Sequence, residues 1–125
     1  MTQKHKDLLL KDLCARLPYG VKCSFGVDDA IYEISGINPT CCGASEIQAT
    51  HIKSGINGDF RLNSCKPYLF PMSSMTEEQK EDMIKSSCGI GSDKNVFDWY
   101  NKNHFDYRGL IPMGLAIDAA GLNIY

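Results

Sequence analysis

The side chains best suited to chemistry lie close together near the C-terminal end of the chain. His104, Asp106 and Arg108 are spaced two residues apart, and Tyr107 stands between the last two. A histidine beside a carboxylate suits a metal ligand pair, or a general base and the group that orients it. The arginine fork matches carboxylate or phosphate. These residues form one candidate ligand site, for a protein that sequesters or hydrolyses a small anion.

The same residues also fit a structural role, which we favour. In this interpretation Asp106 caps a turn, Arg108 pairs with Asp98 or Asp106, and the neighbouring aromatic side chains belong to the core. A charge inside an apolar segment must be paired, exposed or reserved for a ligand, because leaving it buried and unpaired is costly. We therefore predict no catalytic residue in this cluster.

The chain has six cysteines, and we expect most of them to be free thiols. An even number indicates a disulfide framework mainly in secreted proteins. Cys14 and Cys23 fall on predicted apolar faces, where a thiol behaves as a small hydrophobic group. A cysteine paired with a histidine would make a nucleophilic dyad, but no flanking pattern selects any of the six.

Metal and cofactor motifs are absent from the sequence. Cys41 and Cys42 are adjacent and lack the spacing of zinc or redox motifs. They would form a metal site with Cys65 or His51 only if their loop folded back. The chain contains no GxGxxG, phosphate-binding loop or HExxH sequence. We predict no metal site and no cofactor, and leave open whether Cys41, Cys42 and Cys65 have a metal or redox role.

The composition bounds the class of protein. The chain has 125 residues, which suits one domain. Its net charge of −2 predicts no strong attraction to nucleic acid or to anionic membrane. No apolar run approaches the roughly 20 residues of a membrane span, and the N-terminal sequence lacks the apolar run of a signal peptide. We expect no membrane association and a cytoplasmic location.

The elements that must position these residues begin with a helix over residues 4–17. Its apolar stripe is predicted to contain Leu9, Leu10, Leu13, Cys14 and Leu17. Its solvent side is predicted to carry Lys6, Asp7, Lys11, Asp12 and Arg16. Pro18 and Gly20 end the helix.

Antiparallel strands are expected to follow the helix. Residues 21–27 alternate apolar and polar side chains, which is the period of a strand. A two-residue turn at Asp28 and Asp29 would place Cys23 opposite Ile34 on the next strand.

A second hairpin is predicted after a loop at residues 38–45. A strand over 46–56 leads to Asn57 and Gly58, the strongest hairpin signal in the chain, and then to a partner strand over 59–65. A three-residue or bulged connection there would place four apolar side chains on one face: Ile52, Ile56, Phe60 and Leu62.

The pattern changes from strands to helices at residues 66–75, which we name the junction segment. Pro67 and Pro71 favour an extended backbone, and the apolar side chains around them predict contact with a core. Thr76 and Gln79 then have the spacing of a capping box, which begins a helix.

Two helices are expected after the junction segment, over residues 76–87 and 93–102. The second is expected to bury Val96, Phe97, Trp99 and Tyr100. The tail, residues 105–125, is apolar but interrupted by glycine and proline. This pattern predicts short turns and a last strand at 114–118.

Together these elements predict a single α+β domain over residues 1–125. It comprises an N-terminal helix, an antiparallel meander of about four strands, and C-terminal helices packed on one sheet face. The domain divides into the helix and meander (4–65), the junction segment (66–75), and the helical part with its tail (76–125).

Aromatic side chains gather around the junction segment. If they are exposed beside Arg108 and Lys66, they suit a protein-interaction surface, because such surfaces are rich in aromatic residues and arginine. The candidates are Tyr68, Phe70, Trp99 and Tyr100. We favour the alternative that they form the core joining the sheet to the helices.

Two stretches, KPYLFPMSSMTEEQ (residues 66–79) and FDWYNKNHFDYRGLIPMGLAIDA (residues 97–119), resemble uncharacterised small proteins encoded by phages and prophages of anaerobic gut bacteria. The resemblance implies a mobile genetic element as the setting and implies no activity or ligand. We therefore expect a small non-enzymatic binding protein that acts on a host or phage protein. The alternative is the anionic-ligand protein centred on His104, Asp106 and Arg108. A homo-oligomer would suit the apolar tail.

Overall fold

The structure is a computed structural model and describes residues 3–26, 30–37, 47–87 and 92–125. It confirms the α+β class, with an N-terminal helix, one mixed sheet and C-terminal helices. The sheet has six strands in place of about four. Among the helices of these described ranges, none is long and apolar enough to cross a membrane.

Helix α1 (Gln3–Arg16) lies where the sequence predicts it, and a short 3-10 turn (Leu17–Tyr19) follows it. The predicted assignment of its faces is partly wrong. Asp12 and Arg16, expected on the solvent side, are completely buried, whereas Cys14 is exposed. The buried stripe contains Leu9, Asp12, Leu13 and Arg16. This stripe has helical spacing, but two of its four members are charged, so hydrophobicity alone does not show it.

The strands follow the order β4-β3-β2-β1-β5-β6 across the sheet. Their bounds are β1 (Lys22–Ser24), β2 (Tyr32–Ile37), β3 (Ile47–His51), β4 (Asn57–Phe60), β5 (Lys66–Leu69) and β6 (Ile117–Asp118). Strands β1 to β4 form the predicted antiparallel meander. Strand β5 then pairs antiparallel with β1, and β6 adds a parallel strand beyond it.

The register between β1 and β2 differs from the predicted one by two residues. Cys23 lies opposite Tyr32, where the sequence suggested Ile34. A shift of two keeps every side chain on its predicted face, because strands have a period of two. Val21, Cys23 and Phe25 are accordingly buried. The predicted turn at residues 28–29 lies outside the described residues, as does the predicted loop at 38–45.

The second hairpin turns earlier than predicted. Asn57 and Gly58 belong to β4, opposite Thr50 and Ala49, and the turn occupies residues 52–55. Gly58 is needed there for packing, since a Cβ atom would lie 2.9 Å from the Phe60 ring.

This earlier turn also changes which side chains are buried. Ile52 and Ile56, which were expected to share an apolar face with Phe60 and Leu62, are exposed by 46% and 68%. The strand predicted over 59–65 ends at Phe60, and Leu62 is buried in a 3-10 turn (Leu62–Ser64).

The junction segment begins with β5, which lies between β1 and β6. Pro67, Tyr68 and Leu69 are buried there, as the apolar pattern predicts, and Phe70 is half-buried. A 3-10 turn (Met72–Ser74) then leads to helix α2 (Glu77–Ser87).

The capping box at the start of α2 is confirmed. The Gln79 amide donates to the Thr76 hydroxyl at 3.2 Å, and the Thr76 amide donates to the Gln79 side chain at 2.8 Å. Both bonds satisfy backbone donors that the first helical turn leaves free.

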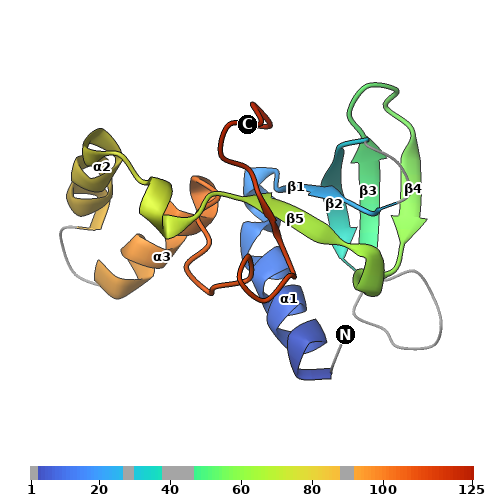
Figure 1. The fold of residues 1–125 in the computed structure, drawn as a ribbon, viewed down its shortest axis with the longest axis horizontal. Helices are drawn as coiled ribbons and strands as arrows, with labels where there is room; N and C mark the ends of the chain where they lie inside the picture. Colours follow the sequence, from blue (N-terminus) through green and yellow to red (C-terminus); the bar gives the residue numbers. More distant parts are fainter. Residues whose placement is uncertain (1–2, 27–29, 38–46, 88–91) are drawn as a thin grey trace.

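Helix α3 (Ser92–Lys102) packs against α2 through the buried Trp99, whose indole N–H donates to Asp82 at 2.7 Å. Phe97, predicted to be buried, is 48% exposed. In Figure 1, α2 and α3 lie at one end of the molecule and β2, β3 and β4 at the other, with α1 and β5 between them. The core therefore centres on α1 and the sheet, with Leu9 and Leu13 of α1 among its members.

Candidate functional site

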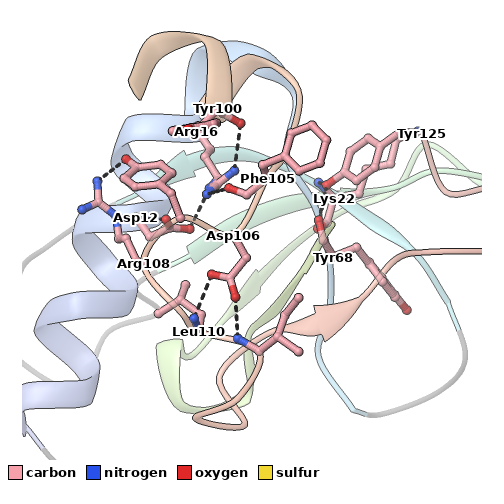
Figure 2. Close-up of polar contacts among 12 residues, drawn as sticks. Asp12, Arg16, Lys22, Tyr68, Tyr100, Phe105, Asp106, Arg108, Leu110 and Tyr125 are labelled. Atoms are coloured by element: carbon pink, nitrogen blue, oxygen red, sulfur yellow. Dashed lines mark hydrogen bonds and ion pairs between the residues drawn. The ribbon is translucent and has the colours of Figure 1, made fainter. Parts of the chain in front are cut away.

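The candidate cluster near the C-terminus contacts two charged residues of α1. Arg16 donates from Nε to Asp12 Oδ2 at 2.8 Å, and both side chains are completely buried. The Arg16 guanidinium also donates to the carbonyl oxygens of Phe105, at 2.5 Å, and Tyr100, at 3.5 Å (Figure 2). Arg16 thus joins α1 to the end of α3 and the segment that follows it.

Arg108 completes this network from the other side. Its Nε atom donates to Asp12 Oδ1 at 3.0 Å, and Nη2 donates to the Tyr107 hydroxyl at 2.6 Å. The predicted partners, Asp98 and Asp106, are wrong. The carboxylate of Asp12 therefore lies between two arginines, each of which also lies near the Tyr107 ring, at 5.5 Å for Arg16 and 4.7 Å for Arg108.

Asp106 caps a turn, as the structural interpretation predicts. Its two carboxylate oxygens accept from the backbone amides of Leu110, at 2.8 Å, and Ile111, at 2.9 Å (Figure 2). Asp106 is 6% exposed. Both of its oxygens are engaged with the backbone, so this carboxylate orients no neighbouring histidine among the described contacts.

His104 is buried against the last residue of the chain. Its backbone has a positive φ of 64°, and its ring stacks on that of Tyr125 with 3.7 Å between ring centroids. Burial, and then the positive charges of Arg16 and Lys22, lower the pKa of His104 to about 4. The imidazole is therefore neutral near pH 7. Its buried Nδ1 atom makes no hydrogen bond within the described part of the chain.

Tyr125 holds the tail against the sheet. Its hydroxyl accepts from the Lys22 amide and donates to the Tyr68 carbonyl, both at 2.8 Å. The Lys22 ammonium donates to the Ile124 carbonyl at 2.7 Å. The hydroxyl of Tyr125 thus connects the tail to both β1 and β5, through Lys22 and Tyr68 (Figure 2).

The four sequence-predicted ligand residues are thus neighbours along the chain with separate structural tasks. His104 packs on Tyr125, and Asp106 caps the turn that begins the tail. Tyr107 accepts from Arg108, which in turn bonds Asp12 of α1. Sequence reasoning missed Asp12 and Arg16, which bind this segment to the first helix. Their i, i+4 spacing beside Leu9 and Leu13 is the signal that could have found them.

The aromatic residues proposed for protein interaction divide between core and surface. Tyr68 and Trp99 are buried, whereas Phe70 and Tyr100 are half-buried. Trp99 stacks on Phe105, with ring planes 10° apart. Tyr68 and Trp99 therefore offer little surface to a partner.

The described cysteines are Cys14, Cys23 and Cys65, and all three are free thiols. Hydrogen bonding with Cys65, and then burial, raise the pKa of the Cys23 thiol, so it stays protonated and unreactive. Within the described residues, no three histidine, cysteine or acidic side chains are grouped as a metal site requires. Cys41, Cys42 and Cys88 lie outside the described residues.

A small hollow lies at the turn end of β2, β3 and β4, away from the predicted cluster. Its volume is about 200 Å³, and its lining includes Tyr32, His51, Ile56 and Phe60. The rings form one group, with Tyr32 5.2 Å from His51 and 5.0 Å from Phe60. Sequence reasoning missed this hollow because it placed the hairpin turn inside β4.

Comparisons of the chain with family models, curated proteins and solved structures give no match.

Proposed function

We propose that this chain is a small non-enzymatic binding protein of a phage or prophage, acting on a host or phage protein. The observation that carries the binding role is the hollow between Tyr32, His51 and Phe60, together with two exposed isoleucines, Ile56 in its lining and Ile52 in the adjoining turn. Ile56 is 68% exposed and Ile52 is 46% exposed. Large apolar side chains around an aromatic hollow are typical of a site that another protein covers. The phage setting rests on the sequence resemblance.

The size of the hollow supports a protein partner over a small molecule. Ligand pockets for small molecules generally measure about 300–1,000 Å³ and enclose most of the ligand. A hollow of about 200 Å³ suits one anchoring side chain of a partner. Asn57 Oδ1 accepts from the Thr50 hydroxyl at 2.6 Å and His51 Nδ1 accepts from the Ser54 amide at 3.1 Å, so the Asn57 NH2 group and His51 Nε2 are the rim donors that would orient that anchor.

The anionic-ligand alternative has weaker support. An arginine that recognises an anion has to keep donors for it, whereas Arg108 already bonds Asp12 and Tyr107. His104 is neutral near pH 7, because its pKa is about 4. Asp106 adds a negative charge and is committed to a turn. The polar groups of Asp106 and Arg108 are therefore already bonded within the protein, and the His104 ring is neutral and buried.

A pair of matched variants tests the binding role. We expect the immobilised wild-type chain to retain a defined host or phage protein, and Ile56→Lys to lose it, since a lysine at the rim cannot bury its charge in the contact. Leu122→Lys is the control, because Leu122 is also exposed, by 50%, and lies in the tail. Equal retention of the partner by both variants would contradict the proposal, provided that both keep the wild-type melting temperature.

A further inference from the structure

Among the described strands, β4 is the outermost one at its side of the sheet, and its backbone groups alternate in direction. The His51 amide donates to the Ile56 carbonyl at 2.9 Å, which fixes the alternation along this strand pair. Gly58 and Phe60 therefore direct their N–H and C=O groups toward β3, whereas Asn57 and Asp59 direct theirs outward. Among the described residues, no hydrogen bond joins the outward backbone groups of Asp59.

The residue after β4 continues this edge. Arg61 has extended backbone angles, φ −90° and ψ 146°. Its N–H points outward like that of Asp59, and its carbonyl, which accepts from Ser64 at 3.1 Å, has a second lone pair free. The side chains of Asp59 and Arg61 are both exposed. One edge therefore presents a negative and a positive side chain two residues apart, each beside outward backbone groups.

We propose that β4 pairs antiparallel with β4 of a second copy of this chain, with Phe60 opposite Phe60 of the other copy. In this register, Asp59 of each copy lies opposite Arg61 of the other. The two residues form a backbone hydrogen-bonded pair, and their side chains form an ion pair. The contact occurs twice, as a two-fold axis requires. A single twelve-stranded sheet would then cross the dimer.

The outward backbone groups of β4 allow several antiparallel registers, and the charges of Asp59 and Arg61 favour the one centred on Phe60. Centring the axis on Asp59 places two carboxylates directly opposite each other, which is destabilising. Centring it on Gly58 pairs Asp59 with Asn57 and leaves Arg61 without a partner on the other strand. Only the axis at Phe60 gives opposite charges at both outward pairs. The same sequence of charges makes the edge complementary to itself, which is why a second copy is the occupant that fits.

The Phe60 side chain also favours the pairing. It stacks on Phe25 with 3.9 Å between ring centroids, yet remains half-buried. A second Phe60 across the axis would cover its exposed part. The interface shares Phe60 with the lining of the hollow, but the two proposals are tested separately, the hollow through Ile56 and the edge through Asp59 and Arg61.

Charge reversal tests the pairing, with sedimentation velocity across a concentration series as the measurement. We expect the wild-type chain to dimerise. Asp59→Arg and Arg61→Asp should each weaken self-association at least tenfold, because each turns both ion pairs into repulsions. An equimolar mixture of the two variants should dimerise again, since every charge then meets its opposite. Glu81→Lys, an exposed charge reversal on α2, is the control and should leave the dimer unchanged.

Two results would overturn the proposal. One is a wild-type chain that stays monomeric at all concentrations up to millimolar. The other is a dimer that both single variants keep, or that the mixture of variants fails to restore. Far-ultraviolet circular dichroism of each variant establishes that it folds, so that loss of association is not mistaken for loss of structure.

Discussion

Asp12 is the residue on which the polar interior depends. It is completely buried and accepts from two guanidinium groups, one of which is also completely buried. A buried ion pair adds little net stability, because desolvation offsets its attraction, but removing one partner leaves an uncompensated charge. Here a single carboxylate compensates two arginines. Its loss is therefore expected to cost more than the loss of Arg108, whose side chain is 17% exposed.

The first prediction compares the two ends of this network. Asp12→Ala should lower the free energy of unfolding by about 3–5 kcal/mol, because it leaves Arg16 buried without its carboxylate. Arg108→Ala should lower it by about 1–3 kcal/mol, since Asp12 keeps Arg16 and only one charged hydrogen bond is lost. Urea unfolding measures both, and Asp7→Ala, at an exposed position on α1, should stay within about 0.5 kcal/mol of wild type.

The same experiment separates the structural role of Arg108 from an anion site. If Arg108→Ala were as stable as wild type, and if added inorganic phosphate stabilised the wild type alone, Arg108 would be reserved for a ligand. The contacts of Arg108 lead us to expect the opposite on both counts.

The second prediction concerns pH. The pKa of His104 is about 4 in the folded chain against an ordinary value of 6.5, so the unfolded chain binds more protons between these values. The contribution of His104 to stability is complete above pH 6.5 and is lost as pH falls toward 4. At about 1.4 kcal/mol per pH unit, the loss between pH 6.5 and 5 is about 2 kcal/mol.

His104→Asn is the matched variant for this pH effect. Asparagine tolerates the positive φ at this position and does not titrate. Its unfolding free energy should therefore change less than that of the wild type between pH 6.5 and 5. Equal slopes for the two proteins would assign the pH dependence to other groups.

At the scale of elements, the correct predictions rest mostly on sequence patterns that span only a few residues. The capping box at Thr76 and Gln79 begins α2 as expected. The alternation of residues 21–27 gives the correct buried face for the part of it that the structure describes. These signals depend on contacts between residues a few positions apart, which a single sequence displays directly.

The third prediction tests the capping box. Thr76→Ala should destabilise α2 by about 1 kcal/mol, since the helix loses a side-chain acceptor for one of its first amides. Hydrogen exchange of the α2 amides should accelerate by about five-fold, while exchange in β5 stays unchanged. Gln79→Glu is the control, because glutamate also completes a capping box. Faster exchange throughout the chain would show that α2 does not open independently.

The second hairpin shows why other elements could not be predicted. Glycine has two physical uses, in turns and where a neighbour leaves no room for Cβ, and the sequence Asn57-Gly58 does not distinguish them. In the structure Gly58 serves the second use, beneath the Phe60 ring. Moving the turn back to residues 52–55 exposed two isoleucines and created the hollow on which the proposed function depends.

The candidate site divides in the same way. The turn capped by Asp106 depends on amides four and five residues away, so the sequence predicted it. The partner of Arg108 is 96 residues away, and no spacing within the tail points to it. Asp98 and Asp106 were chosen because they are near in the chain, and the fold instead supplied Asp12 from α1.

At the scale of the whole molecule, the reactivity of the cysteine thiols measures whether the domain is folded. Among the described thiols, Cys14 is exposed, whereas Cys23 in β1 and Cys65, directly before β5, are buried. The fourth prediction is that alkylation without reductant counts at least four free thiols in the unfolded chain. In the native chain Cys14 should react at once, and Cys23 and Cys65 only when the domain unfolds. Three disulfides, detected by mass spectrometry, would contradict the expected cytoplasmic location.

The bonds between α1 and the C-terminal segment also determine when the chain is able to fold during its synthesis. Asp12 and Arg16 emerge from the ribosome early, but their partners Phe105 and Arg108 emerge some ninety residues later. Until then α1 has two charged side chains on the face that it must bury, without the C-terminal partners that bond them in the folded chain, which is unfavourable. Nascent chains that stop before residue 104 should therefore remain protease-sensitive, and the domain should close in one late, cooperative step.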